Sequence, residues 1–140
     1  IQFHQMTMNN ISQISSGNLS NGQVVISDVL ESKAHSGELI ENNIVAEYFK
    51  QGNILLDQGR YEEANNYYNE ALKINKDLAE IRYQNARCYA LRGSTNLAIG
   101  NLEWAIDINA KYKDTAENDP AFDSIKFNEH FKQVLNEVRH

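Results

Sequence analysis

The chain of 140 residues has few of the features that mark secreted or membrane proteins. Its single cysteine, Cys88, excludes a disulfide within the chain and is typical of a reducing compartment. No apolar run approaches the roughly 18 residues that a membrane-spanning helix needs. The first basic residue is Lys33, so the N-terminus lacks the charged start of a secretory signal peptide. We therefore expect a cytoplasmic location and no membrane insertion.

Basic side chains are also scarce. Thirteen Lys and Arg residues stand against 19 Asp and Glu residues, which gives a formal net charge of −6. This acid excess, without any Lys or Arg cluster, argues against a nucleic-acid partner. With 41% apolar residues the chain has the composition of a folded domain. It opens with Ile1 rather than methionine, which fits a fragment of a longer protein.

Motifs for catalysis, metals and cofactors are missing too. No two histidines have helical i, i+4 spacing, and none forms a metal-ligand pattern with Cys88. We interpret His130, beside Glu129, as part of a solvated polar face, because a general base needs a cleft and partners. Cys88 falls among core positions, which predicts a buried and unreactive thiol. We expect no enzyme, metal site or cofactor.

What the chain does contain is an internal repeat. The stretches GRYEEANNYYNEALKIN (59–75) and GSTNLAIGNLEWAIDIN (93–109) share glycine, alanine, isoleucine and asparagine positions 34 residues apart. The periodicity predicts two helix pairs, at about 38–58 with 62–74 and at about 79–92 with 96–108. Gly59 and Gly93 should end the first helix of each pair in a left-handed conformation. We expect Asn75 and Asn109 to act as left-handed caps after the second helices.

The two ends of the chain differ from the repeats. Residues 1–37 read as a polar N-terminal arm, with no charged residue in 1–23 and one possible short helix at 24–35. At the other end, Asp119-Pro120 predicts an N-cap followed by a first-turn proline. An apolar stripe then predicts one final helix that carries Phe127, Phe131, Val134, Leu135 and Val138.

Small residues recur where a large core residue would bury more area. Ala64, Ala71, Ala98 and Ala105 stand on the second helices, with Gly52 and Ala86 on the first. We expect them to bring helix axes close together, while larger neighbours fill the space beside each contact. The asparagines 65, 66 and 69 we interpret as the exposed side of a helix.

This pattern resembles the tetratricopeptide repeat. Repeat one (45–78) has Tyr48, Gly52, Leu55, Gly59, Tyr61, Ala64, Tyr68 and Ala71 at the family's positions, and repeat two (79–112) has Ala86, Tyr89, Gly93, Ala98, Leu102 and Ala105. Repeat two departs at Arg82, where an aromatic is usual. Residues 113–140 resemble the closing segment of such arrays. The resemblance implies an all-α fold. Residues 38–140 would form one domain, made of two helical hairpins and a C-terminal cap.

The resemblance also implies a concave groove, lined by the first helix of each pair, that binds a partner peptide. By position, this peptide groove would present the residues Phe49, Lys50, Asn53, Asp57, Tyr83, Gln84, Arg87 and Leu91. The family's clamp for chaperone C-terminal tails is absent, because only Asn53 of its five positions agrees. A chaperone tail is therefore not the expected partner.

A second contact surface is suggested by a difference between the repeats. Leu97 and Trp104 replace two glutamates of repeat one, and with Ile108 they form an apolar stripe about 140° from the core face of their helix. We expect the chain's own tail or N-terminal arm to cover this stripe, ahead of a second copy and then of a foreign partner.

Three hypotheses for function follow. The chain is an adaptor or scaffold module that binds a partner peptide, an element that assembles a homodimer or larger scaffold, or the targeting domain of a longer enzyme. The sequence favours the first and does not identify the partner.

Overall fold

The computed structural model describes residues 26–137, with side chains from residue 37 onward, and this part of the chain is all-α as predicted. Its elements in chain order are α2 (Ile26–Asp57), α3 (Tyr61–Ile74), α4 (Ala79–Leu91), α5 (Thr95–Ile108), α6 (Lys111–Glu117), the 3₁₀ helix η1 (Pro120–Ile125) and α7 (Glu129–Asn136). No strand occurs between residues 26 and 137. Most of the polar arm and the predicted stripe residue Val138 lie outside the described residues.

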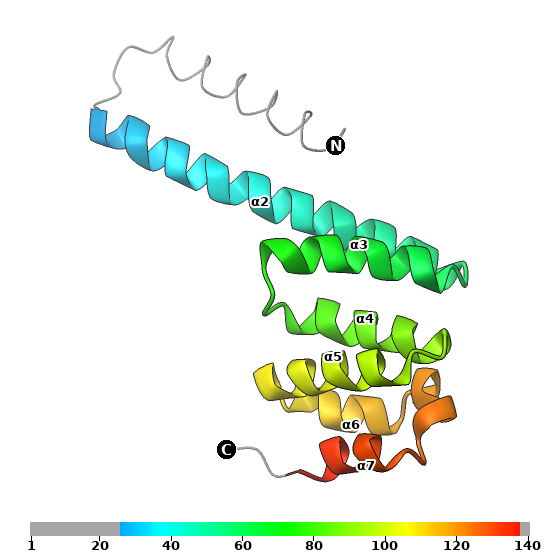
Figure 1. The fold of residues 1–140 in the computed structure, drawn as a ribbon. Coiled ribbons are helices and arrows are strands. Elements are labelled where there is room, and N and C mark those ends of the chain that lie inside the picture. Colours follow the sequence, from blue (N-terminus) through cyan, green and yellow to red (C-terminus); the bar gives the residue numbers. More distant parts are fainter. Residues whose placement is uncertain (1–25, 138–140) are drawn as a thin grey trace. The chain divides into compact units, whose positions relative to one another are not determined.

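The chain divides into two compact units, residues 1–47 and residues 48–140, and the boundary falls inside α2. In the second unit, helices α3 to α7 are stacked in chain order (Figure 1). Helix α4 packs against three of the other elements, namely α3, α5 and η1. Short turns join the helices, so neighbours pack as hairpins.

The two predicted glycine turns are confirmed. Gly59 has φ of +75° and Gly93 has φ of +83°, both in the left-handed region that favours glycine. After Gly59, the amide of Arg60 donates back to the carbonyl of Leu55 over 2.9 Å, and Ser94 donates to Tyr89 over 2.8 Å. These bonds satisfy carbonyls at the ends of α2 and α4 and fix where each hairpin turns.

The prediction for Asn75 and Asn109 is wrong. Both residues are extended, with φ of −143° and −146°, and no residue other than glycine has a positive φ in the described part of the chain. Their side chains explain the difference. Each Oδ1 accepts a hydrogen bond from the amide two residues later, over 3.1 Å from Asp77 and 3.1 Å from Lys111. Each asparagine is still the C-cap residue of its helix, because its own amide donates to the carbonyl of Ala71 or Ala105, but it caps in an extended conformation and its side chain opens the following turn.

Helix α2 is longer than predicted. It begins at Ile26 and continues to Asp57, so the short helix expected at 24–35 and the first repeat helix expected from Glu38 are one element of 32 residues. Gly37, which stands between the two expected helices, lies inside α2. A single interior glycine costs only about 1 kcal/mol relative to alanine, which a long helix can absorb.

The small residues do mark close helix contacts. Ala64, Ala71, Ala98 and Ala105 have no exposed surface. At Gly52 the contact is closest: a Cβ placed there would lie 2.5 Å from the ring of Tyr68, which α3 contributes. Because helix α2 can approach α3 only through this missing side chain, Gly52 sets the spacing of the first hairpin.

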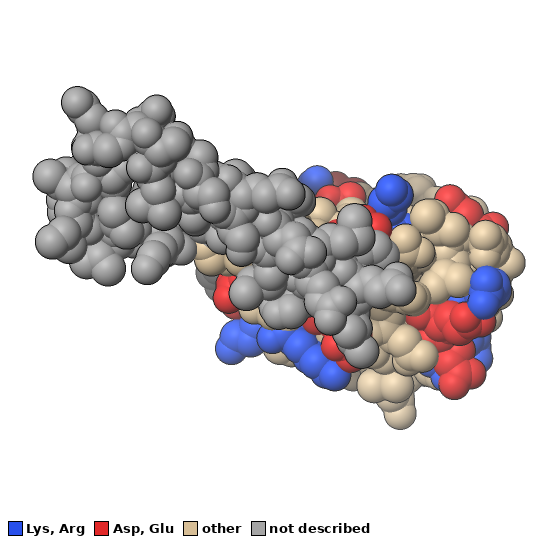
Figure 2. All heavy atoms as spheres, turned by 90° about the horizontal axis from the view of Figure 1, so that it is seen from above, with Lys and Arg blue, Asp and Glu red and all other residues tan. Residues whose placement is uncertain are grey.

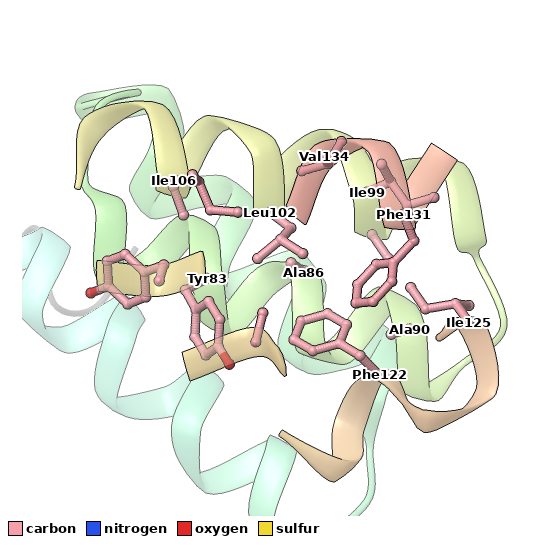
Figure 3. Close-up of a cluster of buried hydrophobic side chains, with 14 of the residues drawn as sticks. Tyr83, Ala86, Ala90, Ile99, Leu102, Ile106, Phe122, Ile125, Phe131 and Val134 are labelled. Carbon is pink, nitrogen blue, oxygen red and sulfur yellow. The ribbon is translucent and has the colours of Figure 1, made fainter. Parts of the chain in front are cut away.

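The C-terminal segment closes the stack as expected. Phe122 and Ile125 of η1 join Phe131 and Val134 of α7 in a buried cluster with side chains of α4 and α5 (Figure 3). Asp119 caps η1, because its Oδ1 accepts from the amide of Ala121 over 2.9 Å. The predicted single stripe is partly wrong. Phe127 precedes α7 and is 77% exposed, since Asn128 starts a new helix by accepting from Phe131 over 3.0 Å.

Candidate protein-interaction surfaces

The residues predicted for the peptide groove on α2 lie along its last turns. Lys50 and Asp57 are exposed, and Phe49 is half-buried with its ring centroid 6.1 Å from that of Tyr68. Asn53 is half-buried, and its Oδ1 accepts a hydrogen bond of 2.6 Å from the Tyr68 hydroxyl. The α2 side of the surface therefore combines an aromatic edge, a fixed amide and two charges of opposite sign.

On α4 the predicted groove residues divide into two kinds. Tyr83 belongs to the core: it is buried, stacks on Tyr112 with centroids 4.9 Å apart, and donates to Asp119 over 2.6 Å. Burial and the bond to the Asp119 carboxylate both raise the pKa of the Tyr83 hydroxyl. Leu91, in contrast, is 39% exposed at the end of the helix.

Arg87 forms part of the joint between α4 and the capping segment. Its Nε lies 2.8 Å from Asp119 Oδ2, an ion pair rather than an aligned hydrogen bond, and its Nη1 donates to Gln84 over 2.8 Å. The Asp119 side chain is only 11% exposed. Because this carboxylate also binds Tyr83 and caps η1, it ties α4 to the C-terminal cap.

Two amides on this surface have a fixed orientation. Asn53 and Gln84 each use the side-chain oxygen as an acceptor within the chain, for Tyr68 and for Arg87. Neither amide nitrogen donates to any group among residues 37–137. Both side chains are half-buried, so two pairs of N–H donors face outward from α2 and α4.

The three residues of the predicted apolar stripe on α5 are exposed. Leu97 is 54% exposed, Trp104 38% and Ile108 43%. Trp104 is held from one side: its indole Nε1 donates to Asp77 over 2.9 Å, and the guanidinium carbon of Arg82 lies 3.5 Å from the ring centroid. The loop before α4 and the first turn of α4 therefore fix the tryptophan ring.

Arg82 and Trp104, which contact each other, both differ from the residues at the equivalent positions of repeat one. In repeat one the equivalent of Arg82 is Tyr48, which packs on Tyr67 with ring centroids 6.1 Å apart. In repeat two, Arg82 donates to Asn101, the equivalent of Tyr67, over 3.0 Å and also covers Trp104. Comparison of the two repeats, position by position, could have found this pair, because both members change together.

The prediction that the asparagine run of α3 is exposed is wrong for Asn65. This side chain is 1% exposed and binds Asn85 of α4, which is fully buried. Asn85 in turn donates to Asn69 over 2.9 Å and to Asn101 of α5 over 3.3 Å. The amides satisfy one another across three helices, so a polar run can be buried here.

The remaining candidates for chemistry have no reactive surroundings. Cys88 is buried, and burial raises the pKa of its thiol to about 12. His130 is exposed on α7. Within residues 37–137, no three His, Cys, Asp or Glu side chains form a group that could hold a metal ion. No helix in the described part of the chain is long and apolar enough to cross a membrane.

Charges of both signs lie close together on the described part of the protein surface. Figure 2 shows Lys and Arg interspersed with Asp and Glu on the face that it draws. Exposed ion pairs such as Lys73 with Glu70, 2.8 Å apart, neutralise neighbouring charges. Binding of a partner to this surface would therefore depend on individual side chains more than on a long-range electrostatic field.

Comparison with known proteins found one matching protein family. Residues 45–78 match the family described as tetratricopeptide repeat. Searches of the curated proteins and of the solved structures each found no match. The match covers α3 and the end of α2, and α4 with α5 repeats the same hairpin 34 residues later. This match, together with the helical hairpins that follow it, supports a repeat protein of the tetratricopeptide type.

Proposed function

We propose that this chain is a non-catalytic adaptor module that binds a peptide segment of a partner protein along α2 and α4. Tetratricopeptide repeats generally mediate protein–protein interactions, and residues 45–78 match this family. The partner segment would lie across the surface of Phe49, Asn53, Gln84 and Leu91. Self-assembly and a targeting role within a longer enzyme are the other candidates, and no contact in the structure favours either.

The observation that supports this proposal is the pair of oriented amides. Tyr68 fixes Asn53 and Arg87 fixes Gln84, and each leaves its N–H donors toward solvent. A peptide backbone offers carbonyl acceptors, so donors that are already oriented can bind it with little loss of side-chain entropy.

Apolar and charged groups beside the amides would supply selectivity. Leu91 and the edge of Phe49 could contact an apolar anchor of the peptide. Lys50 and Asp57, about two turns apart on α2, would place opposite charges along the bound segment. Arg87 would act mainly by holding Gln84, because its guanidinium already pairs with Asp119.

A substitution that replaces the N–H donors with carboxylate oxygens tests the proposal, with a control for the added charge. The double variant Asn53→Asp and Gln84→Glu keeps both acceptor oxygens, and therefore the bonds from Tyr68 and Arg87. A matched control, Asn66→Asp with Gln133→Glu, makes the same change of charge at exposed positions on α3 and α7.

Peptides that bind the full chain would be selected from a displayed library of natural protein segments and titrated calorimetrically. We expect the double variant to bind at least about tenfold more weakly, the equivalent of about 1.4 kcal/mol, and the control to bind like the unmodified chain. Equal affinity for the double variant would place the binding surface elsewhere. A chain that selects no peptide but doubles its mass with concentration would support self-assembly instead.

A further inference from the structure

The outward face of α5 has a shape suited to another helix. Leu97, Gly100, Asn101 and Trp104 stand at i, i+3, i+4 and i+7, the spacing of the four residues that surround a knob in helix–helix packing. Ile108 extends the row by one more turn. Leu97, Gly100 and Trp104 are all exposed, so the hole that they border is open.

Gly100 has no role within the described part of the chain that would explain it. A Cβ placed there would find no atom within 4 Å, and φ at Gly100 is not in the left-handed region. This differs from Gly52, where the ring of Tyr68 leaves no room for a side chain. A glycine inside a helix costs stability, and Gly100, unlike Gly37, leaves its gap within an exposed row of large apolar side chains, which points to an external contact.

Trp104 is already ordered for contact. Its Nε1 is satisfied by Asp77 and one face of its ring is covered by Arg82, whereas 38% of the residue remains exposed. Because the ring is held before any partner arrives, little side-chain entropy is lost on binding. Tryptophan is also one of the residue types that are enriched in binding hot spots.

The size of the surface indicates what could occupy it. At about 200 Å² for a fully exposed large side chain, the exposed fractions of Leu97, Trp104 and Ile108 amount to about 270 Å². A stable interface usually buries about 800 Å² on each partner. Two copies of this chain that met stripe to stripe would therefore bury too little, whereas one helix laid along α5 would cover the row in a transient contact.

We propose that the outward face of α5 binds a single α-helix of a partner protein, with a large apolar side chain of that helix seated over Gly100 between Leu97 and Trp104. This surface is separate from the one that α2 and α4 form, so the chain could hold two partner segments at once. The bound helix would carry an apolar seam at i, i+3 or i+4, and i+7.

The experiment uses a displayed library of 21-residue helices without tryptophan, in which the seam positions vary among apolar residues. Selection is carried out on the full chain, and the enriched helix is titrated while the emission of Trp104 is recorded. Trp104 is the only tryptophan in the sequence, so its spectrum reports on the proposed site. We expect a blue shift that saturates.

Two variants place the site. Gly100→Leu fills the hole and should weaken binding at least about tenfold, and Leu97→Ser, at an exposed position, should do so without affecting the fold. Gly37→Leu makes the same change at a helix glycine that also has no atom within 4 Å of its Cβ, and should bind normally. The groove variant Asn53→Asp with Gln84→Glu should also bind normally.

Several results would overturn the inference. One is that no helix is enriched, or that enriched helices leave the Trp104 spectrum unchanged. Another is that Gly100→Leu and Leu97→Ser both bind as tightly as the unmodified chain. A blue shift that appears on concentrating the chain alone would assign the surface to a second copy instead of a partner helix.

Discussion

Replacing Gly52 with alanine should destabilise the protein, although the same change stabilises most helices. The new Cβ would lie 2.5, 2.7 and 2.9 Å from Cε1, Cδ1 and Cζ of Tyr68. That ring is fully buried, and its hydroxyl is bound to Asn53 over 2.6 Å, so it cannot move aside freely. Helix α2 or the ring must shift, and both movements disturb the contact with α3.

The magnitude follows from three terms. Overpacking of a core contact costs about 1–3 kcal/mol, and loss of the buried Tyr68 hydrogen bond costs about 1 kcal/mol more. The better helix propensity of alanine returns about 1 kcal/mol. We therefore expect the free energy of unfolding to fall by about 1–3 kcal/mol.

Urea denaturation followed by circular dichroism at 222 nm would measure this change. Gly100→Ala is the matched control, because its Cβ meets nothing within 4 Å, and it should stabilise the chain by about 0.4–1 kcal/mol. In a Tyr68→Leu background the penalty of Gly52→Ala should shrink, since the two sites are coupled. A Gly52→Ala variant as stable as the unmodified chain would refute the close contact between α2 and α3.

Three further predictions concern other contacts. Arg82→Ala should red-shift the emission of Trp104 and cost about 0.5–1 kcal/mol by urea denaturation, because it uncovers one face of the ring; an unchanged spectrum would contradict the contact. Asp119→Ala should cost about 2–4 kcal/mol by the same assay, since one carboxylate caps η1 and binds two side chains of α4, whereas a loss below 0.5 kcal/mol would show that the cap is held otherwise. Burial raises the pKa of Cys88 to about 12 and that of Tyr68 above its usual value, so the native state keeps protons that the unfolded chain loses from about pH 9 upward. The free energy of unfolding should therefore fall as the pH rises from about 8.5 to about 11. In Cys88→Ala the fall near pH 9 should be less steep, and a free energy that does not change with pH would contradict the burial of the two side chains.

The helical hairpins could be predicted because local and long-range signals agree. Gly59 and Gly93 must adopt positive φ at a tight turn, and Ala64 and Ala98 permit the close approach that the turn creates. Asparagine gives a weaker signal, since it can cap a helix or open a turn through its side chain. Asn75 does both, and it stays extended because its side chain accepts from the amide of Asp77.

The contacts between repeats could not be derived from periodicity alone. Whether Asn65 is exposed depends on Asn85, 20 residues away on another helix, and no helical pattern contains that information. The sequence did place Trp104 away from the core of its helix, but its partner Arg82 was noted only as a departure from the family pattern. Which peptide-groove residues remain available also depended on tertiary contacts, as the burial of Tyr83 shows.

Assignment of the side-chain amide resonances of Asn53 and Gln84 by ¹⁵N NMR would test the central claim most directly. A peptide selected for binding to the full chain would be titrated into the labelled protein. The account predicts that both amides shift, together with the backbone of Leu91, while the amides of α7 stay in place. Binding that leaves Asn53 and Gln84 unshifted would contradict an interaction surface on α2 and α4.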